Sequence, residues 1–135
     1  MSQTFSILLV EDDDPLRRCL TEVLAARGWN VHPTGVAQEA LEIARRFHVD
    51  FSILDFHLRG MTGLDVLKAI TREVRPLPSI MMSGQASQEE TAAALRAGAF
   101  TFLRKPLELH NLLSAVDQLI RMRLQGGPSH SQPPF

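Results

Sequence analysis

The stretch that decides the fold is Phe5-Ser6-Ile7-Leu8-Leu9-Val10-Glu11-Asp12-Asp13-Asp14-Pro15. Its apolar first half predicts a buried strand, and the acids and proline that follow predict a polar loop that opens a helix. Apolar residues then recur every three or four positions from Leu16 to Leu24, and Gly28 suits the end of that helix. A strand that leads directly into a helix is the repeating unit of α/β proteins.

The same alternation recurs along the chain and gives five strand–helix units. Strands this uniformly apolar are buried on both faces, so we expect a parallel sheet with helices on both sides. Five units are too few for a barrel of about 250 residues, which favours an open, doubly wound α/β sheet. The later strands are predicted near Trp29–His32, Phe51–Leu54, Ser79–Met82 and Phe100–Leu103, and the later helices within Ala37–Phe47, Leu64–Val74, Ser87–Gly98 and Leu109–Ile120.

Three local features refine this prediction. Pro33 has no N–H to donate to a neighbouring strand, so the second strand fits best at a sheet edge. Ser87 and Glu90 are spaced as a capping box at the start of the fourth helix. Asp14, directly before Pro15, is a suitable N-cap for the first helix.

Composition and length exclude several classes of protein. The 135 residues suffice for one domain of ordinary size, predicted over 1–123, and the Gly/Pro/Ser-rich residues 124–135 predict a flexible tail or linker. A net charge of -1 disfavours direct binding of nucleic acid by this chain. The apolar runs are too short to cross a membrane, Met1–Thr4 lacks the pattern of a signal peptide, and Cys19 has no disulfide partner, so we expect a cytoplasmic protein.

Chemistry-bearing residues follow four of the predicted strands. They are Glu11 to Asp14, Asp55, Ser83-Gly84 and Arg104-Lys105-Pro106. Taken singly, each group has a structural explanation as a cap, a turn or an exposed loop. Together they are expected at one edge of the sheet, because ligands of open α/β sheets bind outside the carboxyl ends of the strands.

This set suits a phosphoryl group and a divalent cation. Clustered carboxylates repel one another unless a cation lies among them, and Mg²⁺ prefers oxygen ligands. The hydroxyl of Ser83 and the ammonium of Lys105 are donors for phosphoryl oxygens. Asp55 can accept a phosphoryl group as an acyl phosphate.

From Phe5 to about Arg123 the chain resembles the receiver domains of bacterial two-component response regulators. The resemblance implies a flavodoxin-like (βα)5 fold with strand order 2-1-3-4-5. It rests on four motifs in the right order, which are Leu8-Leu9-Val10-Glu11-Asp12-Asp13, Asp50-Phe51-Ser52-Ile53-Leu54-Asp55 with Gly60-Met61-Thr62-Gly63, Met82-Ser83-Gly84, and Gly98-Ala99-Phe100-Thr101-Phe102-Leu103-Arg104-Lys105-Pro106.

The resemblance also implies a role for each site residue. Asp55 is the expected phosphoacceptor, and Lys105 is expected to contact the phosphoryl group. Ser83 and Phe102 are the expected switch hydroxyl and switch aromatic, whereas simple packing is the expectation for Phe100. His57 is expected to modulate the lifetime of the acyl phosphate rather than to act as a phosphorelay histidine. The expected ligands of Mg²⁺ are Glu11, Asp12, Asp55 and the backbone carbonyl of His57.

Three positions depart from the common family pattern. Glu11 stands where Asp is frequent, and its longer side chain is expected to reach the metal through water. Arg59 stands where proline is common, which predicts a more mobile loop or a contact with a partner. Ser83 replaces the frequent Thr, and the aromatic is Phe102 in a chain without tyrosine, and both keep the group that the switch needs.

By this resemblance the chain is a signalling domain that assists only its own phosphorylation and dephosphorylation, and not an enzyme. The expected phosphoryl donor is a histidine kinase or a histidine phosphotransfer protein, and the expected receiver of the signal is a downstream output domain or protein. A homodimer through the fourth helix, fifth strand and fifth helix is also compatible with the family.

Three alternatives are weighed against this interpretation. Phosphohydrolases of the haloacid dehalogenase type also use an aspartate after a strand, but they have a second Asp where this chain has His57. A flavin or nucleotide module would have a glycine-rich loop after the first strand, where Glu11 to Asp14 stand. A receiver fold that signals without phosphorylation would not need the complete set of acids, Ser83 and Lys105.

Overall fold

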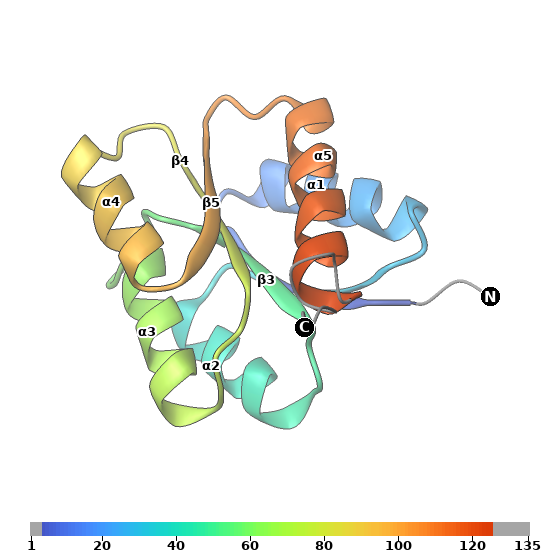
Figure 1. The fold of residues 1–135 in the computed structure, drawn as a ribbon, viewed down its shortest axis with the longest axis horizontal. Helices are drawn as coiled ribbons and strands as arrows, with labels where there is room; N and C mark the ends of the chain where they lie inside the picture. The colour runs from blue at the N-terminus through green and yellow to red at the C-terminus, as the bar shows by residue number, and fades with distance from the viewer. Residues whose placement is uncertain (1–3, 126–135) are drawn as a thin grey trace, which may run out of the picture.

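Five parallel strands form one sheet in the order β2-β1-β3-β4-β5 in the computed structural model, which describes residues 4–125 (Figure 1). This confirms the predicted doubly wound α/β fold and its strand order. The strands are β1 (Ser6–Val10), β2 (Asn30–Thr34), β3 (Phe51–Asp55), β4 (Ser79–Ser83) and β5 (Ala99–Arg104). Of the predicted tail 124–135, residues 126–135 lie outside the described part of the chain, so the domain boundary stays a prediction.

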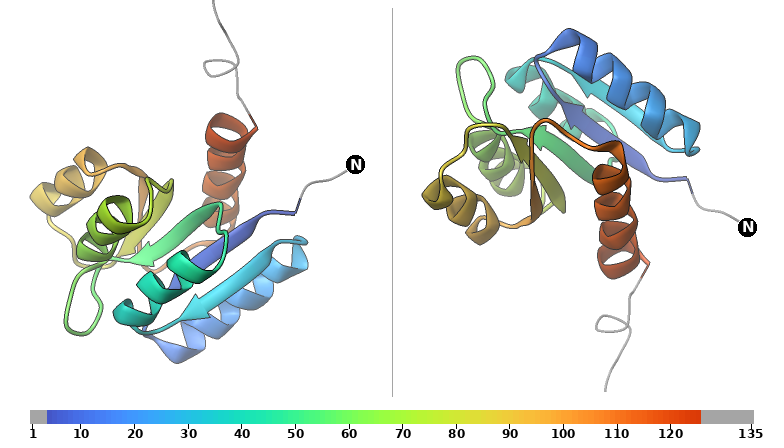
Figure 2. Two further views of the ribbon diagram at one scale, coloured as in Figure 1. Left: turned by 90° about the horizontal axis from the view of Figure 1, so that it is seen from below. Right: turned by 90° about the horizontal axis from the view of Figure 1, so that it is seen from above.

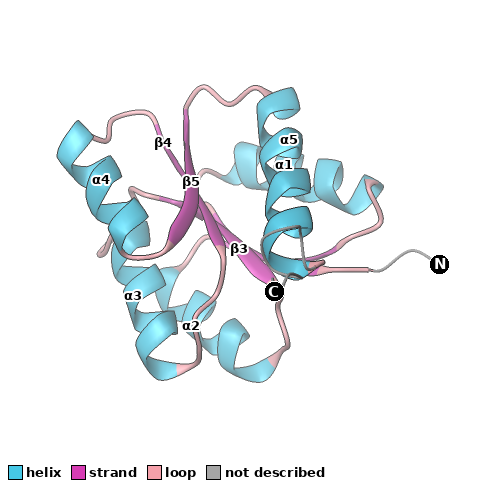
Figure 3. Cartoon of the chain, in the orientation of Figure 1, coloured by secondary structure: helices cyan, strands magenta, loops and turns pink. Residues whose placement is uncertain are grey.

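Helices cover both faces of the sheet. In Figure 3 the strands form a layer between α1 and α5 on one side and α2, α3 and α4 on the other. Two apolar clusters fill the spaces between these layers, so each face of the sheet is buried. The helices are α1 (Asp14–Ala26), α2 (Ala37–Arg46), α3 (Gly63–Glu73), α4 (Gln88–Arg96) and α5 (Leu109–Leu119), and α5 continues into a π-helical segment, η1 (Ile120–Leu124).

The central strands are buried because both of their faces are covered by helices. Every residue of β3 and β4 is buried. β1 lies between β2 and β3, and the two views in Figure 2 show β1 and β3 running side by side. The strand order therefore brings the carboxyl ends of β1, β3 and β4 to one edge.

The edge strand β2 extends further than predicted. It continues through Pro33 to Thr34, with Pro33 opposite Leu9. A proline is tolerated here because β2 has only one neighbouring strand, so the missing N–H can lie on the open side.

The N-cap of α1 is Asp13, not the predicted Asp14. The Asp13 carboxylate accepts a hydrogen bond from the backbone N–H of Leu16 at 2.9 Å, whereas Asp14 is the first helical residue and pairs with Arg17. Pro15 lies in the first turn, and Gly28 follows the helix with a φ of 91° that favours glycine, both as predicted.

Capping boxes begin α3 and α4. The predicted box of α4 is confirmed: Ser87 accepts from the N–H of Glu90, and Glu90 accepts from the N–H of Ser87. Thr62 and Asp65 make the same reciprocal pair at α3. Both helices therefore begin at fixed points directly after loops of the candidate site.

A bulge in β5 sets the directions of its two phenylalanines. Ser79 pairs with Ala99, but the next residue of β4, Ile80, pairs with Thr101, so Phe100 is an extra residue. Phe100 consequently packs on the α1/α5 side of the sheet and Phe102 on the α2/α3/α4 side.

No helix within residues 4–125 is long and apolar enough to span a membrane.

Candidate functional site

The carboxylates of Glu11, Asp12 and Asp55 converge at the carboxyl edge of the sheet. Glu11 and Asp12 directly follow β1, and Asp55 is the last residue of β3. One oxygen from each carboxylate lies within 4.8 Å of the other two. Glu11 is fully buried, Asp55 is 4% exposed and Asp12 is half-buried. The predicted convergence of these acids is therefore present.

Lys105 links two of these carboxylates. Its Nζ donates to Glu11 Oε1 at 2.9 Å and lies 3.3 Å from Asp55 Oδ1. Lys105 follows β5, and its backbone N–H donates to the carbonyl of Ser83 at 3.0 Å. The lysine is thus held between the ends of three strands, next to the carboxylate that is expected to be the acceptor.

Burial and charge shift two pKa values in this cluster. Burial raises the pKa of the Glu11 carboxyl, and the hydrogen bonds from Lys105 and the Asp13 N–H only partly oppose that shift. Burial works against the charge on Lys105, but its hydrogen bonds and attraction to Glu11 and Asp55 raise the pKa of the ammonium above its usual value. Lys105 is therefore a cation throughout the neutral range.

Glu11 is engaged by protein groups on both oxygens. Lys105 occupies Oε1, and the N–H of Asp13 donates to Oε2 at 3.1 Å. Asp12 makes no such contact with Lys105, and its half-exposed carboxylate is the freer of the two. The expectation that Glu11 reaches a metal ion through water stays a prediction.

Arg17 and Gly35 also shape the acidic loop, and sequence reasoning missed both. The Arg17 guanidinium donates to the backbone carbonyl of Glu11 at 2.8 Å. A side chain on Gly35 would meet that guanidinium at 2.7 Å, so Gly35 provides its space. The pairing of Asp14 with Arg17 three residues later was the available signal.

The loop after Asp55 is folded tightly against the site. His57 and Thr62 form an antiparallel bridge, and the N–H of Gly63 donates to the carbonyl of Phe56 at 2.7 Å. A Cβ on Gly63 would lie 2.2 Å from the carbonyl oxygen of Asp55. Glycine is therefore required there for α3 to begin beside Asp55. Arg59 is exposed within this loop.

Ser83 is 1% exposed at the end of β4 and has three hydrogen-bond partners. Its Oγ accepts from the N–H groups of Gln85 and Ala86 at 3.0 and 3.1 Å. The third partner is Nδ1 of His57, 3.1 Å from the hydroxyl oxygen. The side chain of His57 therefore lies against Ser83, a contact that the sequence did not predict.

Phe102 lies half-buried beside the same group of residues. Its ring centroid is 6.1 Å from that of Phe56, and the Phe56 ring is 5.0 Å from the His57 ring in an edge-on arrangement. The two expected switch residues, Ser83 and Phe102, are thus connected through the side chains of His57 and Phe56.

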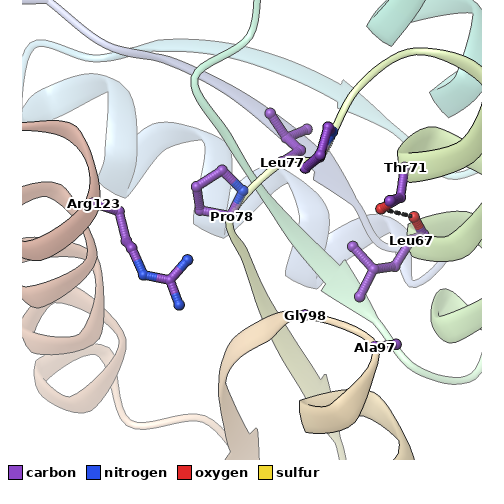
Figure 4. Close-up of a pocket in the computed structure, with 8 residues that line it drawn as sticks. Leu67, Thr71, Leu77, Pro78, Ala97, Gly98 and Arg123 are labelled. Carbon is purple, nitrogen blue, oxygen red and sulfur yellow. Dashed lines mark hydrogen bonds between the residues drawn. The ribbon is translucent and has the colours of Figure 1, made fainter.

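A pocket of about 320 Å³ lies away from this site, near the amino ends of β4 and β5 (Figure 4). Pro78 directly precedes β4 and Gly98 directly precedes β5, and Figure 4 shows the Arg123 side chain directed toward them. None of the acids at the carboxyl edge lines this pocket, so it is separate from the candidate site.

The sequence matches the family of response regulator receiver domains over residues 7–117. The chain belongs to the response regulator receiver domain family. The predicted resemblance is therefore confirmed, and with it the assignment to a family of signalling domains rather than classical enzymes.

Relatives of this receiver domain include longer regulatory proteins. The chain is 31% identical over 117 residues to the regulatory protein AtoC of Escherichia coli, covering 87% of this chain and 25% of AtoC. It is 30% identical over 119 residues to the probable transcriptional regulatory protein TcrX of Mycobacterium tuberculosis, covering 88% of this chain and 51% of TcrX. The chain thus spans about a quarter of AtoC and about half of TcrX.

A solved receiver domain has the same fold. The CheY-like response regulator receiver domain protein from Methanospirillum hungatei superimposes with a TM-score of 0.86 at 25% identity, covering 93% of this chain and all of that one. The two chains therefore share one fold over most of this chain's length.

Proposed function

We propose that this receiver domain takes a phosphoryl group from a phosphohistidine onto Asp55 and thereby switches a surface that partners recognise. The observation that carries the proposal is the pairing of Asp55 Oδ1 with the Lys105 ammonium at 3.3 Å, beside two further carboxylates. A nearly buried carboxylate with a cation beside it suits transfer of an anionic group, because that cation can stabilise charge that develops during the reaction.

The residues present fit a Mg²⁺ ion. Their donors are all oxygens, and three carboxylates gathered so closely call for more positive charge than Lys105 provides. Asp12, Asp55 and the backbone carbonyl of His57 would hold the ion, with Glu11 supporting it through water. When bound, Mg²⁺ would neutralise negative charge on the transferred phosphoryl oxygens.

The transfer itself needs few protein groups. An Asp55 carboxylate oxygen attacks phosphorus, the bond from phosphorus to the donor's imidazole nitrogen breaks, and that nitrogen keeps the electron pair. The Lys105 ammonium neutralises charge on the transferred group, as its position beside Asp55 supports. The product is an acyl phosphate that carries about −1.5 to −2 charge.

The signal depends on Ser83 and Phe102. The phosphoryl oxygens are new acceptors for the Ser83 hydroxyl. Before phosphorylation, Ser83 Oγ accepts hydrogen bonds from the N–H groups of Gln85 and Ala86 in the β4–α4 loop. When Ser83 moves to donate to the phosphoryl group, the loop loses these bonds, and the half-buried Phe102 turns further inward. The surface formed by α4, β5 and α5 changes as a result.

The proposed partners follow from this scheme. A histidine kinase or a histidine phosphotransfer protein supplies the phosphoryl group, and an output domain or protein reads the changed surface. A homodimer through the α4–β5–α5 surface is part of the proposal, and the exposed apolar side chains of Leu95 in α4 and Leu109 in α5 support it.

Phosphorylation by a small donor tests the proposal. Wild type incubated with Mg²⁺ and acetyl phosphate should gain one alkali-labile phosphoryl group, observed by intact mass, and Asp55→Asn should gain none. Labelling of Asp55→Asn to the wild-type extent would show that another residue is the acceptor.

A further inference from the structure

The hydrogen bond between His57 and Ser83 has a fixed direction. A serine hydroxyl has one proton and two lone pairs. The N–H groups of Gln85 and Ala86 both donate to Ser83 Oγ, so they occupy its two lone pairs. The hydroxyl proton is then directed to the remaining partner, Nδ1 of His57 at 3.1 Å. His57 is therefore the acceptor of this bond, as its Nε2–H tautomer.

Packing holds the His57 ring in this position. The backbone of His57 is bridged to Thr62, and its ring lies edge-on to Phe56, with an interplanar angle of 64°. Phe56 is 2% exposed, so this support is part of the core. The exposed His57 side chain thus has a defined direction toward Ser83, which lowers the entropy cost of the bond.

His57 and a phosphoryl group on Asp55 would need the same proton. Phosphoryl oxygens are acceptors, and the Ser83 hydroxyl cannot donate its only proton to two acceptors. We propose that His57 is a positioning residue that holds the Ser83 hydroxyl in the unphosphorylated arrangement and so opposes the switch. This inference rests on the proposed function, and it concerns the equilibrium before phosphorylation rather than the lifetime of the acyl phosphate.

Replacing His57 by leucine should remove one neutral hydrogen bond from the unphosphorylated state. Such a bond corresponds to about a two- to tenfold change in an equilibrium constant. In excess Mg²⁺, His57→Leu should bind beryllofluoride, a stand-in for the phosphoryl group, about two- to tenfold more tightly than wild type. His57→Asn should bind nearly as wild type does, because its Oδ1 can accept from Ser83 at the position of the His57 Nδ1.

A double-mutant cycle with Ser83→Ala shows whether the effect passes through the hydroxyl. In the Ser83→Ala background, His57→Leu should leave the dissociation constant for beryllofluoride, measured by titration calorimetry, unchanged. Calorimetry with Mg²⁺ alone should give the same affinity for His57→Leu and wild type. An equal gain with and without Ser83, no gain in the His57→Leu single variant, or an equal gain in Mg²⁺ affinity overturns the inference.

The result separates this inference from the proposed function. If wild type binds beryllofluoride but the cycle is additive, only the role of His57 is wrong. If wild type binds no more beryllofluoride than Asp55→Asn, the proposed phosphorylation of Asp55 is wrong as well.

Discussion

The positive charge of Lys105 offsets the negative charges of the buried carboxylates of Glu11 and Asp55. Its Nζ lies 2.9 Å from Glu11 Oε1 and 3.3 Å from Asp55 Oδ1. A buried charge without a partner costs several kcal/mol, so the ammonium is what makes these two buried acids tolerable. In the proposed transfer, the same charge would face the oxygens of the phosphoryl group on Asp55.

We expect Lys105→Met to lower the rate of phosphorylation by acetyl phosphate about 100-fold, because losing one preorganised donor to a developing anion typically costs that much. The variant should bind Mg²⁺ more tightly than wild type, since the acids have lost the positive charge beside them. Intact mass over time and calorimetry measure the two effects. Lys68→Met, an exposed position in α3, is the matched control, and equal rates for the two variants would contradict the role of Lys105.

A close backbone contact leaves no space for a side chain at Gly63. A Cβ there would lie 2.2 Å from the Asp55 carbonyl oxygen and 3.0 Å from Met81 Sδ. We expect Gly63→Ala to lower the free energy of unfolding by about 1–3 kcal/mol or more, as overpacking of a tight site does. Urea denaturation measures the change. Gly84→Ala should have a much smaller effect on stability, because the nearest atom to its Cβ is 3.5 Å away.

At the scale of the elements, two capped helices begin where loops of the site end. The capping boxes at Thr62 and Ser87 satisfy N–H groups in the first turns of α3 and α4. His57 lies in the loop before α3, and Ser83 is the last residue of β4, directly before the loop to α4, so the helix starts limit how far those loops can move.

We expect Ser87→Ala to lower the free energy of unfolding by about 1 kcal/mol, because it removes the side chain that accepts from the N–H of Glu90. Ser114→Ala, at an exposed position inside α5, should instead be neutral or slightly stabilising, since alanine has the higher helix propensity. Thermal denaturation of both variants provides the comparison. Equal losses of stability would mean that the cap contributes nothing specific.

Elements governed by local or periodic patterns were predictable from the sequence. The type of each strand and helix, their succession along the chain and the capping box at Ser87 depend on spacing within a few residues, and the edge position of β2 follows from the missing N–H of Pro33. The bulge at Phe100 was not predictable, because it is defined by pairing with β4. The N-cap of α1 was misassigned by one residue because adjacent aspartates can each act as a cap.

The candidate site was predictable only in part for the same reason. Residues at strand ends must meet at one edge, which brings together Glu11, Asp12 and Asp55. The orientation of a side chain within the edge depends on packing, so the bond between His57 and Ser83 had no sequence signal. The contact of Gly63 with the backbone of Asp55 also had no sequence signal, although Gly63 ends the motif Gly60-Met61-Thr62-Gly63.

At the scale of the whole molecule, the sheet separates two apolar clusters but joins all parts of the site. The acidic cluster lies at the ends of strands whose residues are buried on both faces. Repulsion among the carboxylates therefore lowers the free energy of unfolding of the whole domain. A cation that binds among them and reduces this repulsion stabilises the native state.

We expect Mg²⁺ to raise the stability of wild type by about 2.7 kcal/mol at 100 times its dissociation constant. Asp12→Asn should be more stable than wild type in chelator, because one of three mutually repelling charges is gone, and should gain little from Mg²⁺. Urea denaturation with and without Mg²⁺ measures both effects. A wild-type-sized gain in Asp12→Asn would place the ion elsewhere.

The most direct test of the account is a crystal structure of the protein with Mg²⁺ and beryllofluoride. We predict beryllium bonded to a carboxylate oxygen of Asp55, Mg²⁺ held by Asp12, Asp55 and the backbone carbonyl of His57, and Lys105 in contact with fluorine. The Ser83 hydroxyl should point to another fluorine rather than to His57. A structure in which this edge binds neither ion, or in which both ions bind elsewhere, would contradict the assignment of Asp55 as the acceptor.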